Sequence, residues 1–203
     1  MILRRHRYIM KFMLPAYGIP VPPVRFLFMV LFFLVIPPVI SSQPSEYMLK
    51  AVALEKLALF IEWPDEQKTD MDQPFIIDVL EPNPMSKALE EVYQKHKIKG
   101  KTVKIKIIHD IRELDRITPC HVLFIPELSP TKLAKILEIT RKKPVLTIAD
   151  AEGYASLGCD MNFYFNAEGK LRFEINQEAM KADGFTIDFK LLNLAKVVNS
   201  GKM

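Results

Sequence analysis

The chain has 203 residues, of which 49% are hydrophobic and 26% are charged, an ordinary composition for one globular domain with its own core. Its net charge of +4 arises at the N-terminus: five of the 28 bases lie in residues 1–41, which contain no acid, and the other 23 nearly balance the 24 acids. A nearly neutral domain does not attract a polyanion, so the composition argues against nucleic acid as a partner.

An uninterrupted apolar run, Phe26–Ile36, follows Arg25 and precedes two prolines and the small polar pair Ser41-Ser42. A basic segment, an apolar core and small polar residues occur in this order in secretory signals. Residues 1–42 are therefore predicted to be a secretory signal segment, and residues 43–203 a single exported domain.

An uncleaved inner-membrane anchor through residues 26–40 is the alternative. This stretch has 15 residues, whereas a helix that spans a bilayer needs about 20, so cleavage is favoured. The part that precedes the apolar run is long and contains proline, which makes Met10 or Met13 a candidate for the true translation start.

The exported part alternates helix and strand patterns. Apolar residues recur every three or four positions after Ser45, which predicts an amphipathic helix that ends at Trp63-Pro64, because the residue before a proline avoids the helical region. Further helices are predicted at residues 84–97, 111–116, 130–141, 152–157, 177–181 and 189–198. Strands are predicted at residues 75–80, 102–108, 121–125, 145–149, 161–165 and 171–175, with a polar loop at 64–74.

The last two strands flank Asn166–Gly169, whose Asn and Gly favour a tight turn, and they predict an antiparallel hairpin over Met161–Asn176. The run at residues 121–125 is apolar throughout, as strands buried on both faces of a parallel sheet are. The pattern predicts an α/β fold: a mostly parallel β-sheet of about six strands flanked by helices, with a C-terminal antiparallel hairpin.

Motifs for catalysis and cofactor binding are missing from the sequence. It contains no GxGxxG, GxxxxGK[ST], HExxH, GxSxG or CxxC pattern. His96, His109 and His121 are scattered over different elements, and Cys120 and His121 are neighbours on a strand, where they point to opposite faces. The sequence predicts no enzyme, no metal and no cofactor.

Thr147 and Asp150 lie at the carboxyl end of a predicted parallel strand. Ligands of open α/β sheets bind at this edge, so the two residues are candidates for lining a ligand site. In the alternative interpretation, Asp150 caps the short helix that follows.

Cys120 and Cys159 each precede a predicted strand, so they meet at one edge of the sheet if the two strands are parallel. An exported chain enters an oxidising compartment, and a disulfide closing this loop would contribute on the order of 4 kcal/mol in the chain-entropy model. Two buried free thiols are an equally supported alternative, because the neighbouring residues are hydrophobic.

Residues 46–198 resemble the YfiR-like family of exported bacterial proteins. Four blocks carry the resemblance: Lys50-Ala51 with FIEWP at 60–64, CHVLFI at 120–125, PVLTIAD at 144–150 with GYA at 153–155, and GKLRFEIN at 169–176 with LLNLA at 191–195. The order and spacing of the blocks make the resemblance specific.

The resemblance implies a periplasmic regulator without catalytic activity. The best-known member binds the periplasmic sensor domain of an inner-membrane diguanylate cyclase and keeps it inactive, and release of the cyclase raises cyclic di-GMP and promotes biofilm formation. The family also implies an α/β fold that tends to form a homodimer.

Two interpretations follow for the functional residues. Phe60 and Trp63, at the aromatic end of the first helix, are candidates for the partner surface, although an end of the helix that packs into the core also explains them. The alternative function is a periplasmic small-ligand-binding module that feeds a sensor protein, with its site near Thr147 and Asp150.

Overall fold

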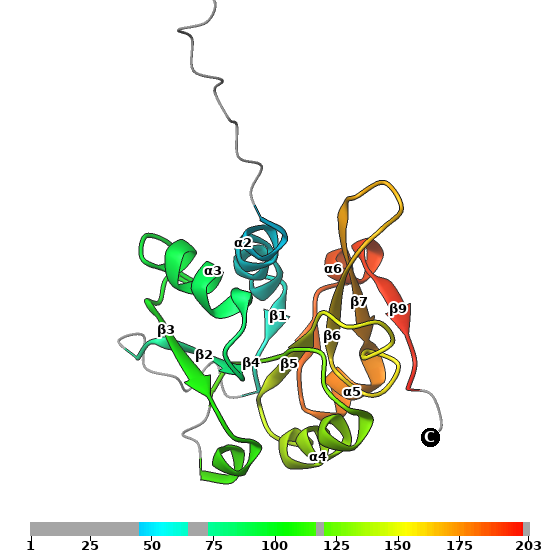
Figure 1. The fold of residues 1–203 in the computed structure, drawn as a ribbon. Coiled ribbons are helices and arrows are strands. Elements are labelled where there is room, and N and C mark those ends of the chain that lie inside the picture. Colours follow the sequence, from blue (N-terminus) through cyan, green and yellow to red (C-terminus); the bar gives the residue numbers. More distant parts are fainter. Residues whose placement is uncertain (1–44, 65–72, 117–119, 201–203) are drawn as a thin grey trace, which may run out of the picture. The chain divides into compact units, whose positions relative to one another are not determined.

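A seven-stranded sheet in the order β3-β2-β4-β5-β6-β7-β9 forms the centre of the protein (Figure 1). The computed structural model describes residues 45–64, 73–116 and 120–200, so the predicted secretory segment lies outside the described residues. The strands of this sheet are β2 (Phe75–Leu80), β3 (Val103–Ile108), β4 (Val122–Ile125), β5 (Leu146–Ala149), β6 (Met161–Phe165), β7 (Leu171–Asn176) and β9 (Lys196–Val198). A separate antiparallel pair joins β1 (Ile61–Glu62) to β8 (Thr186–Ile187).

The predicted α/β fold is confirmed. Strands β2 to β6 run parallel, and β7 returns antiparallel to β6 in the predicted hairpin, with Phe163 opposite Phe173. The sheet has one strand more than the sequence pattern indicates, because β9 pairs with β7 in parallel and extends that edge.

The helices begin at polar caps that satisfy their first free amides. They are α2 (Glu46–Ala58), α3 (Pro84–Tyr93), α4 (Pro130–Thr140), α5 (Gln177–Ala182) and α6 (Phe189–Leu194), with a 3-10 helix, η2, at Ile111–Arg116. The Ser45 hydroxyl accepts a hydrogen bond from the Met48 amide, and the Asn176 side chain accepts one from the Ala179 amide. Such caps fix where a helix starts.

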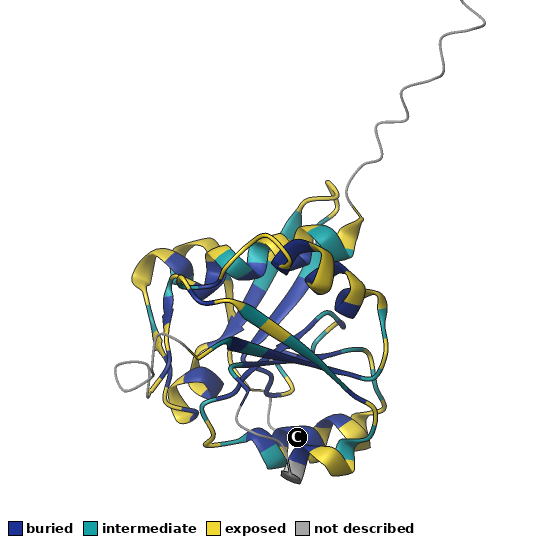
Figure 2. Cartoon of the chain, turned by 90° about the vertical axis from the view of Figure 1, so that its left-hand side faces the viewer, coloured by how far each residue is buried: buried dark blue, intermediate teal, exposed yellow. Residues whose placement is uncertain are grey.

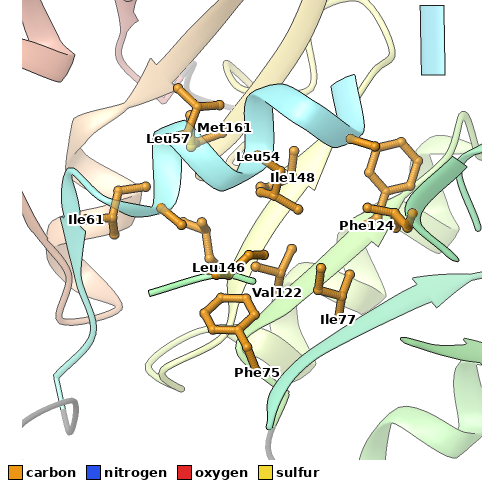
Figure 3. Packing of buried hydrophobic residues seen from close by; sticks show 14 of the residues in the cluster. Leu54, Leu57, Ile61, Phe75, Ile77, Val122, Phe124, Leu146, Ile148 and Met161 are labelled. Atoms are coloured by element: carbon orange, nitrogen blue, oxygen red, sulfur yellow. The ribbon is translucent and has the colours of Figure 1, made fainter. Parts of the chain in front are cut away.

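Two hydrophobic clusters cover the two faces of the sheet (Figure 2). Val122 and Phe124 of β4 face the first cluster, where α2 and α3 pack, and the alternate residues Leu123 and Ile125 face the second, where α4 packs. Figure 3 shows α2 lying across the first cluster, with Leu54 among the strand side chains. The sheet is thus buried on both sides, as the apolar run of β4 predicts.

The predicted helices differ from the structure in four places. The first helix ends at Ala58 rather than at Trp63, because Ile61 and Glu62 pair with β8; the proline at 64 sets only an outer limit. The last helix ends at Leu194, where the chain turns into β9. Residues 152–157, predicted as a short helix, form turns instead, and α3 ends at Tyr93 rather than at residue 97. Pairing with distant strands, which local periodicity does not reveal, decides the first two cases.

Gly184 ends α5 and provides the first test of the fold. Its φ of +90° lets the Phe185 amide bond back to the Met180 carbonyl at 2.9 Å, and a Cβ there would lie 2.8 Å from Pro64 Cγ. Gly184→Ala should lower the free energy of unfolding by about 1–3 kcal/mol, from backbone strain and the contact with Pro64 together. Gly169→Ala is the matched control, because φ is also positive but no atom lies within 4 Å of a Cβ. Equal losses in urea denaturation of both variants would show that the contact with Pro64 costs nothing.

Candidate functional site

Trp63 lies in the core and is 7% exposed. Its Nε1 donates a hydrogen bond to the His121 carbonyl at 3.0 Å, and its ring meets those of Phe75 and Phe185 edge to face, at centroid distances of 5.4 and 5.7 Å. Phe60 is half-buried against the same cluster. The aromatic end of the first predicted helix therefore has few apolar atoms to offer a partner.

Other apolar side chains are exposed on α2 and at its C-cap. Leu49, Val52 and Leu59 are 39, 44 and 55% exposed, although they are large hydrophobic residues. Their spacing places them on one side of the helix, opposite the buried row of Ala51, Leu54 and other core residues. Grouped exposed apolar residues are typical of an interaction surface.

Phe189 adds to this surface from a distant part of the chain. It is 72% exposed and begins α6, directly after β8. Ile61 pairs with Ile187, and the Asp188 amide bonds to the Phe60 carbonyl at 2.9 Å. Leu59 and Phe189 are the next residues along the chain from this bond, so their backbones lie near each other. We call Leu49, Val52, Leu59 and Phe189 the docking surface.

The docking surface leaves little trace in the sequence, for two reasons. Leu59 falls within the predicted first helix, and Phe189 begins another predicted helix, so both look like core residues. The pairing of β1 with β8, which brings them together across 130 positions of sequence, leaves no local signal because each strand has only two residues. The one weak sign of the surface in the sequence is Phe189, an apolar residue at the first position of α6, immediately after the cap Asp188.

Thr147 and Asp150, the predicted ligand pair, are not brought together. Thr147 lies within β5 and its side chain bonds to Asp160, on the α4 side of the sheet. Asp150 follows β5, and its carboxylate is held by Lys50 of α2, on the other side. Since both polar groups are already satisfied by the protein and face different layers, they do not form a common ligand site.

Lys50 and Asp150 form a buried ion pair. Nζ lies 2.9 Å from Oδ2, and the two side chains are 6 and 11% exposed. The ammonium also lies over the rings of Tyr47, at 4.8 Å from the centroid, and Phe165, at 5.6 Å. Such ring contacts stabilise a cation that burial removes from water. Through the ion pair and the contact with Phe165, Lys50 links the first turns of α2 to the ends of β5 and β6.

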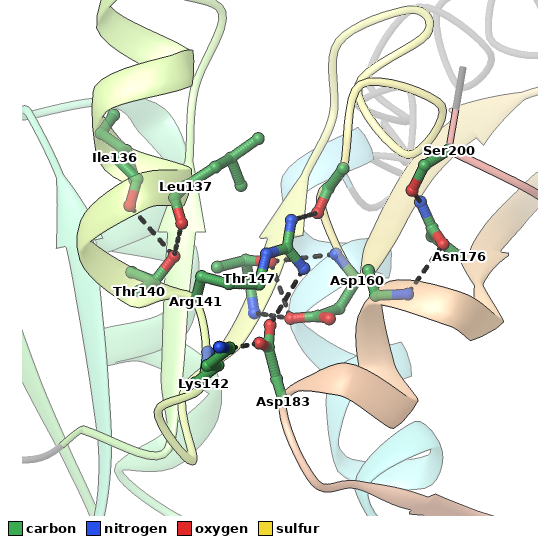
Figure 4. A network of polar contacts seen from close by, with 12 residues as sticks. Ile136, Leu137, Thr140, Arg141, Lys142, Thr147, Asp160, Asn176, Asp183 and Ser200 are labelled. Carbon is green, nitrogen blue, oxygen red and sulfur yellow. Dashed lines mark hydrogen bonds and ion pairs between the residues drawn. The ribbon is translucent and has the colours of Figure 1, made fainter. Parts of the chain in front are cut away.

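A second polar network lies on the α4 side, around Asp160 (Figure 4). Its Oδ2 accepts hydrogen bonds from the amide and the hydroxyl of Thr147, both at 2.8 Å, while Oδ1 is buried without a hydrogen-bond partner. Nearby, Asp183 accepts from Arg141 at 3.3 Å and from the Lys142 amide at 2.6 Å. Burial raises the pKa of Asp160 from 3.8 to about 7, although the two Thr147 bonds oppose the shift.

The raised pKa of Asp160 predicts a pH dependence of stability. Between the unfolded pKa of 3.8 and the folded pKa of about 7, the folded state holds a proton that the unfolded state has lost. The stabilisation is therefore complete at acid pH and is lost as pH rises toward 7. Asp160→Asn, which cannot ionise, should lose more stability relative to the wild type at about pH 4.5 than at about pH 8. A difference in unfolding free energy that stays constant over this range would contradict the prediction.

Cys120 and Cys159 are both free and buried, and both belong to the second hydrophobic cluster. The Cys120 thiol lies beside the buried carboxyl of Asp78, and burial, reinforced by this neighbour, raises the pKa of the thiol above its ordinary value. Burial also raises the pKa of the Cys159 thiol. Thiols held protonated react slowly. The predicted disulfide stays a prediction, and mass measurement without reduction tests it.

The histidines do not converge on a metal site. His121 accepts a hydrogen bond from the Ile76 amide at Nδ1, at 3.0 Å, and His96 lies 3.2 Å from Glu55. Among the residues that the structure describes, no three His, Cys, Asp or Glu side chains are grouped as metal ligands. No helix within residues 45–64, 73–116 and 120–200 has the length and apolarity to cross a membrane.

Comparison with known proteins identifies relatives of the fold. The model of the YfiR/HmsC-like family matches residues 47–196. The crystal structure of a conserved domain protein from Vibrio cholerae O1 biovar El Tor has a similar fold, with a TM-score of 0.50 and 13% sequence identity. The match covers 77% of this chain but only 61% of that protein. A comparison with curated proteins finds no match.

Proposed function

Because the chain belongs to the YfiR/HmsC-like family, we propose that it is a periplasmic, non-catalytic regulator that binds the sensor domain of an inner-membrane diguanylate cyclase. The family supports a regulatory role in cyclic di-GMP signalling and implies interaction with a signalling partner. Binding keeps the cyclase inactive, and its release raises cyclic di-GMP and promotes biofilm formation. Secretion through residues 1–42 gives the domain access to the periplasmic side of the membrane.

The docking surface is the observation that carries this proposal. Its apolar side chains come from α2, from the C-cap of α2 and from the start of α6, and the pairing of β1 with β8 brings the chain near Leu59 close to the chain near Phe189. Large apolar side chains that are exposed on a rigid scaffold contribute most of the binding energy when a partner covers them. We assign this surface, rather than the buried Trp63, to contact with the cyclase.

The docking surface yields a sharp test. Leu59→Glu/Phe189→Glu should abolish capture of the cyclase when the tagged protein is incubated with solubilised host membranes, because two charges would be buried at the contact. Loss of either anchor should weaken binding by about 30-fold or more, the effect of one hot-spot residue.

Leu157→Glu is the matched control for this test. Leu157 is an exposed leucine, 37% accessible, in the turns that follow β5, and it packs beside α4 rather than α2. This variant should capture the cyclase as the wild type does. If the wild type, Leu59→Glu/Phe189→Glu and Leu157→Glu all capture the cyclase equally, the docking surface is not the contact. The protein would then bind the cyclase through another surface.

The alternative function is a small-ligand module with its site near Thr147 and Asp150. We favour the regulator because Thr147 already bonds to Asp160 and Asp150 to Lys50. The homodimer implied by the resemblance stays a prediction. Sedimentation of the wild type and of Leu59→Glu/Phe189→Glu tests it and shows whether the docking surface is also used between copies.

A further inference from the structure

The order of the strands reverses between β2 and β4. The connection after β2 leads through α3 to β3 on one side, whereas the connection after β4 leads through α4 to β5 on the other. The buried residues of α3 belong to the first cluster and those of α4 to the second, so the two helices leave the sheet on opposite faces. In open α/β sheets the crevice at such a reversal, beyond the carboxyl ends of the strands, is the usual place for a ligand.

A cavity of about 250 Å³ lies at this position. Its apolar wall is formed by residues from the end of β2, the start of η2, the loop after β4, and α4: Leu80, Ile111, Leu128 and Ile136. Its polar side is formed by Glu81, Asp110, His109 and Lys132. A cavity of this size, smaller than drug-sized pockets, suits a small molecule with an apolar body and one polar group.

The cavity wall is held in place by the protein. The Tyr154 hydroxyl donates to the Leu128 carbonyl at 2.8 Å and accepts from the Leu128 amide at 2.6 Å, so the loop after β4 is fixed at both backbone groups. On the opposite side, the Asn83 amide bonds to the Leu80 and Glu81 carbonyls. Glu81 has a φ of +58°, a conformation that non-glycine residues seldom adopt.

An ammonium group already occupies the polar side of this cavity. Lys132 Nζ lies 3.2 Å from Glu81 Oε1. Hydrogen bonds from Arg112, and to a smaller extent the charge of Lys132, lower the pKa of Asp110. The two carboxylates outnumber the one lysine among the groups that line the cavity. Lys132 and Glu81 are 57 and 42% exposed, so this ion pair is weak and Lys132 can be displaced into solvent. Asp110 also accepts a hydrogen bond from Arg112 Nε at 2.9 Å. Glu81 is therefore the carboxylate that is open to a ligand ammonium.

We propose that this cavity binds a small primary ammonium compound with an apolar alkyl or aryl body. The ammonium takes the place of Lys132 Nζ at Glu81, and the apolar body lies against Leu128 and Ile111, the two apolar lining residues that are half-buried rather than fully buried. Lys132 competes with the ligand from within the chain. The site is separate from the docking surface and does not depend on the proposed cyclase partner.

The test uses phenethylammonium as the probe and amide NMR shifts of the ¹⁵N-labelled protein as the readout. The wild type should show saturable shifts at residues 80–81, 109–111 and 128. Glu81→Gln should weaken binding by about tenfold, the loss of one charge-assisted hydrogen bond. Lys132→Ala should tighten binding by several-fold, because its own ammonium no longer competes.

Two probes of the same shape separate charge from apolar burial: 3-phenylpropionate carries the opposite charge, and 2-phenylethanol carries none. The proposal predicts that both bind more weakly than the ammonium probe. It is overturned if none of these amides shifts at about 10 mM probe, if 3-phenylpropionate binds best, or if Lys132→Ala weakens binding of the ammonium. Because the two substitutions should act in opposite directions, a general loss of structure cannot imitate the expected result.

Discussion

Lys50→Met should lower the free energy of unfolding by about 3–5 kcal/mol, because it leaves the Asp150 carboxylate buried without its partner. The lysine stem is replaced by a side chain of similar length, so little packing is lost. What disappears is the ammonium, which lies 2.9 Å from Asp150 and within 6 Å of the Tyr47 and Phe165 ring centroids. Urea denaturation monitored by fluorescence of Trp63 measures the loss.

A second substitution shows whether the charge is the cause. Lys50→Met/Asp150→Asn removes both charges, and it should recover most of the stability that the single variant loses, because no unpaired charge is left inside. The pair Lys196–Glu174 is the contrast, since its lysine side chain is 61% exposed. Lys196→Met should change stability by about 1 kcal/mol or less. A loss below about 1 kcal/mol in Lys50→Met would show that the buried pair is dispensable.

Trp63→Ala should also cost about 3–5 kcal/mol, because it removes a large buried aromatic side chain. The indole ring meets Phe75 and Phe185 edge to face, and its Nε1 hydrogen bond to the His121 carbonyl joins the residue after β1 to the residue before β4. Trp63→Phe keeps most of the apolar volume but loses that hydrogen bond, so its loss should be smaller. Thermal and urea unfolding of both variants, followed by far-UV circular dichroism, measure the two effects.

The same substitution separates the two interpretations of the aromatic segment. If Trp63 is a core residue, Trp63→Ala loses stability, and at a temperature where it stays folded it still captures the cyclase. If Trp63 is part of the partner surface, the variant keeps its stability and loses capture. Because Trp63 is only 7% exposed, we expect the first result.

Local patterns account for much of the fold. Period-two alternation and the Asn166–Gly169 turn predict the hairpin of β6 and β7, and the uniformly apolar run at β4 predicts a strand buried on both faces. Ser45, Ser129 and Asn176 mark helix starts because their side chains accept the first free amides. Each of these signals lies within a few residues of the element that it predicts.

Features that depend on distant pairing escaped prediction. The β1–β8 pair, with two residues a strand, carries no periodicity, yet it ends α2 early and brings Leu59 to Phe189. Asp150 was assigned to a ligand edge because strand position is visible in sequence, whereas its partner Lys50 lies 100 residues away. Asp160, which bonds to Thr147 across β5 and β6, was missed for the same reason.

The most direct test of the central claim is the cellular level of cyclic di-GMP in the host after deletion of this gene. Regulation of a cyclase by the docking surface predicts that the level rises in the deletion strain, returns to normal when the wild-type protein is supplied, and stays high when Leu59→Glu/Phe189→Glu is supplied at equal abundance. An unchanged level after deletion would contradict the proposed function.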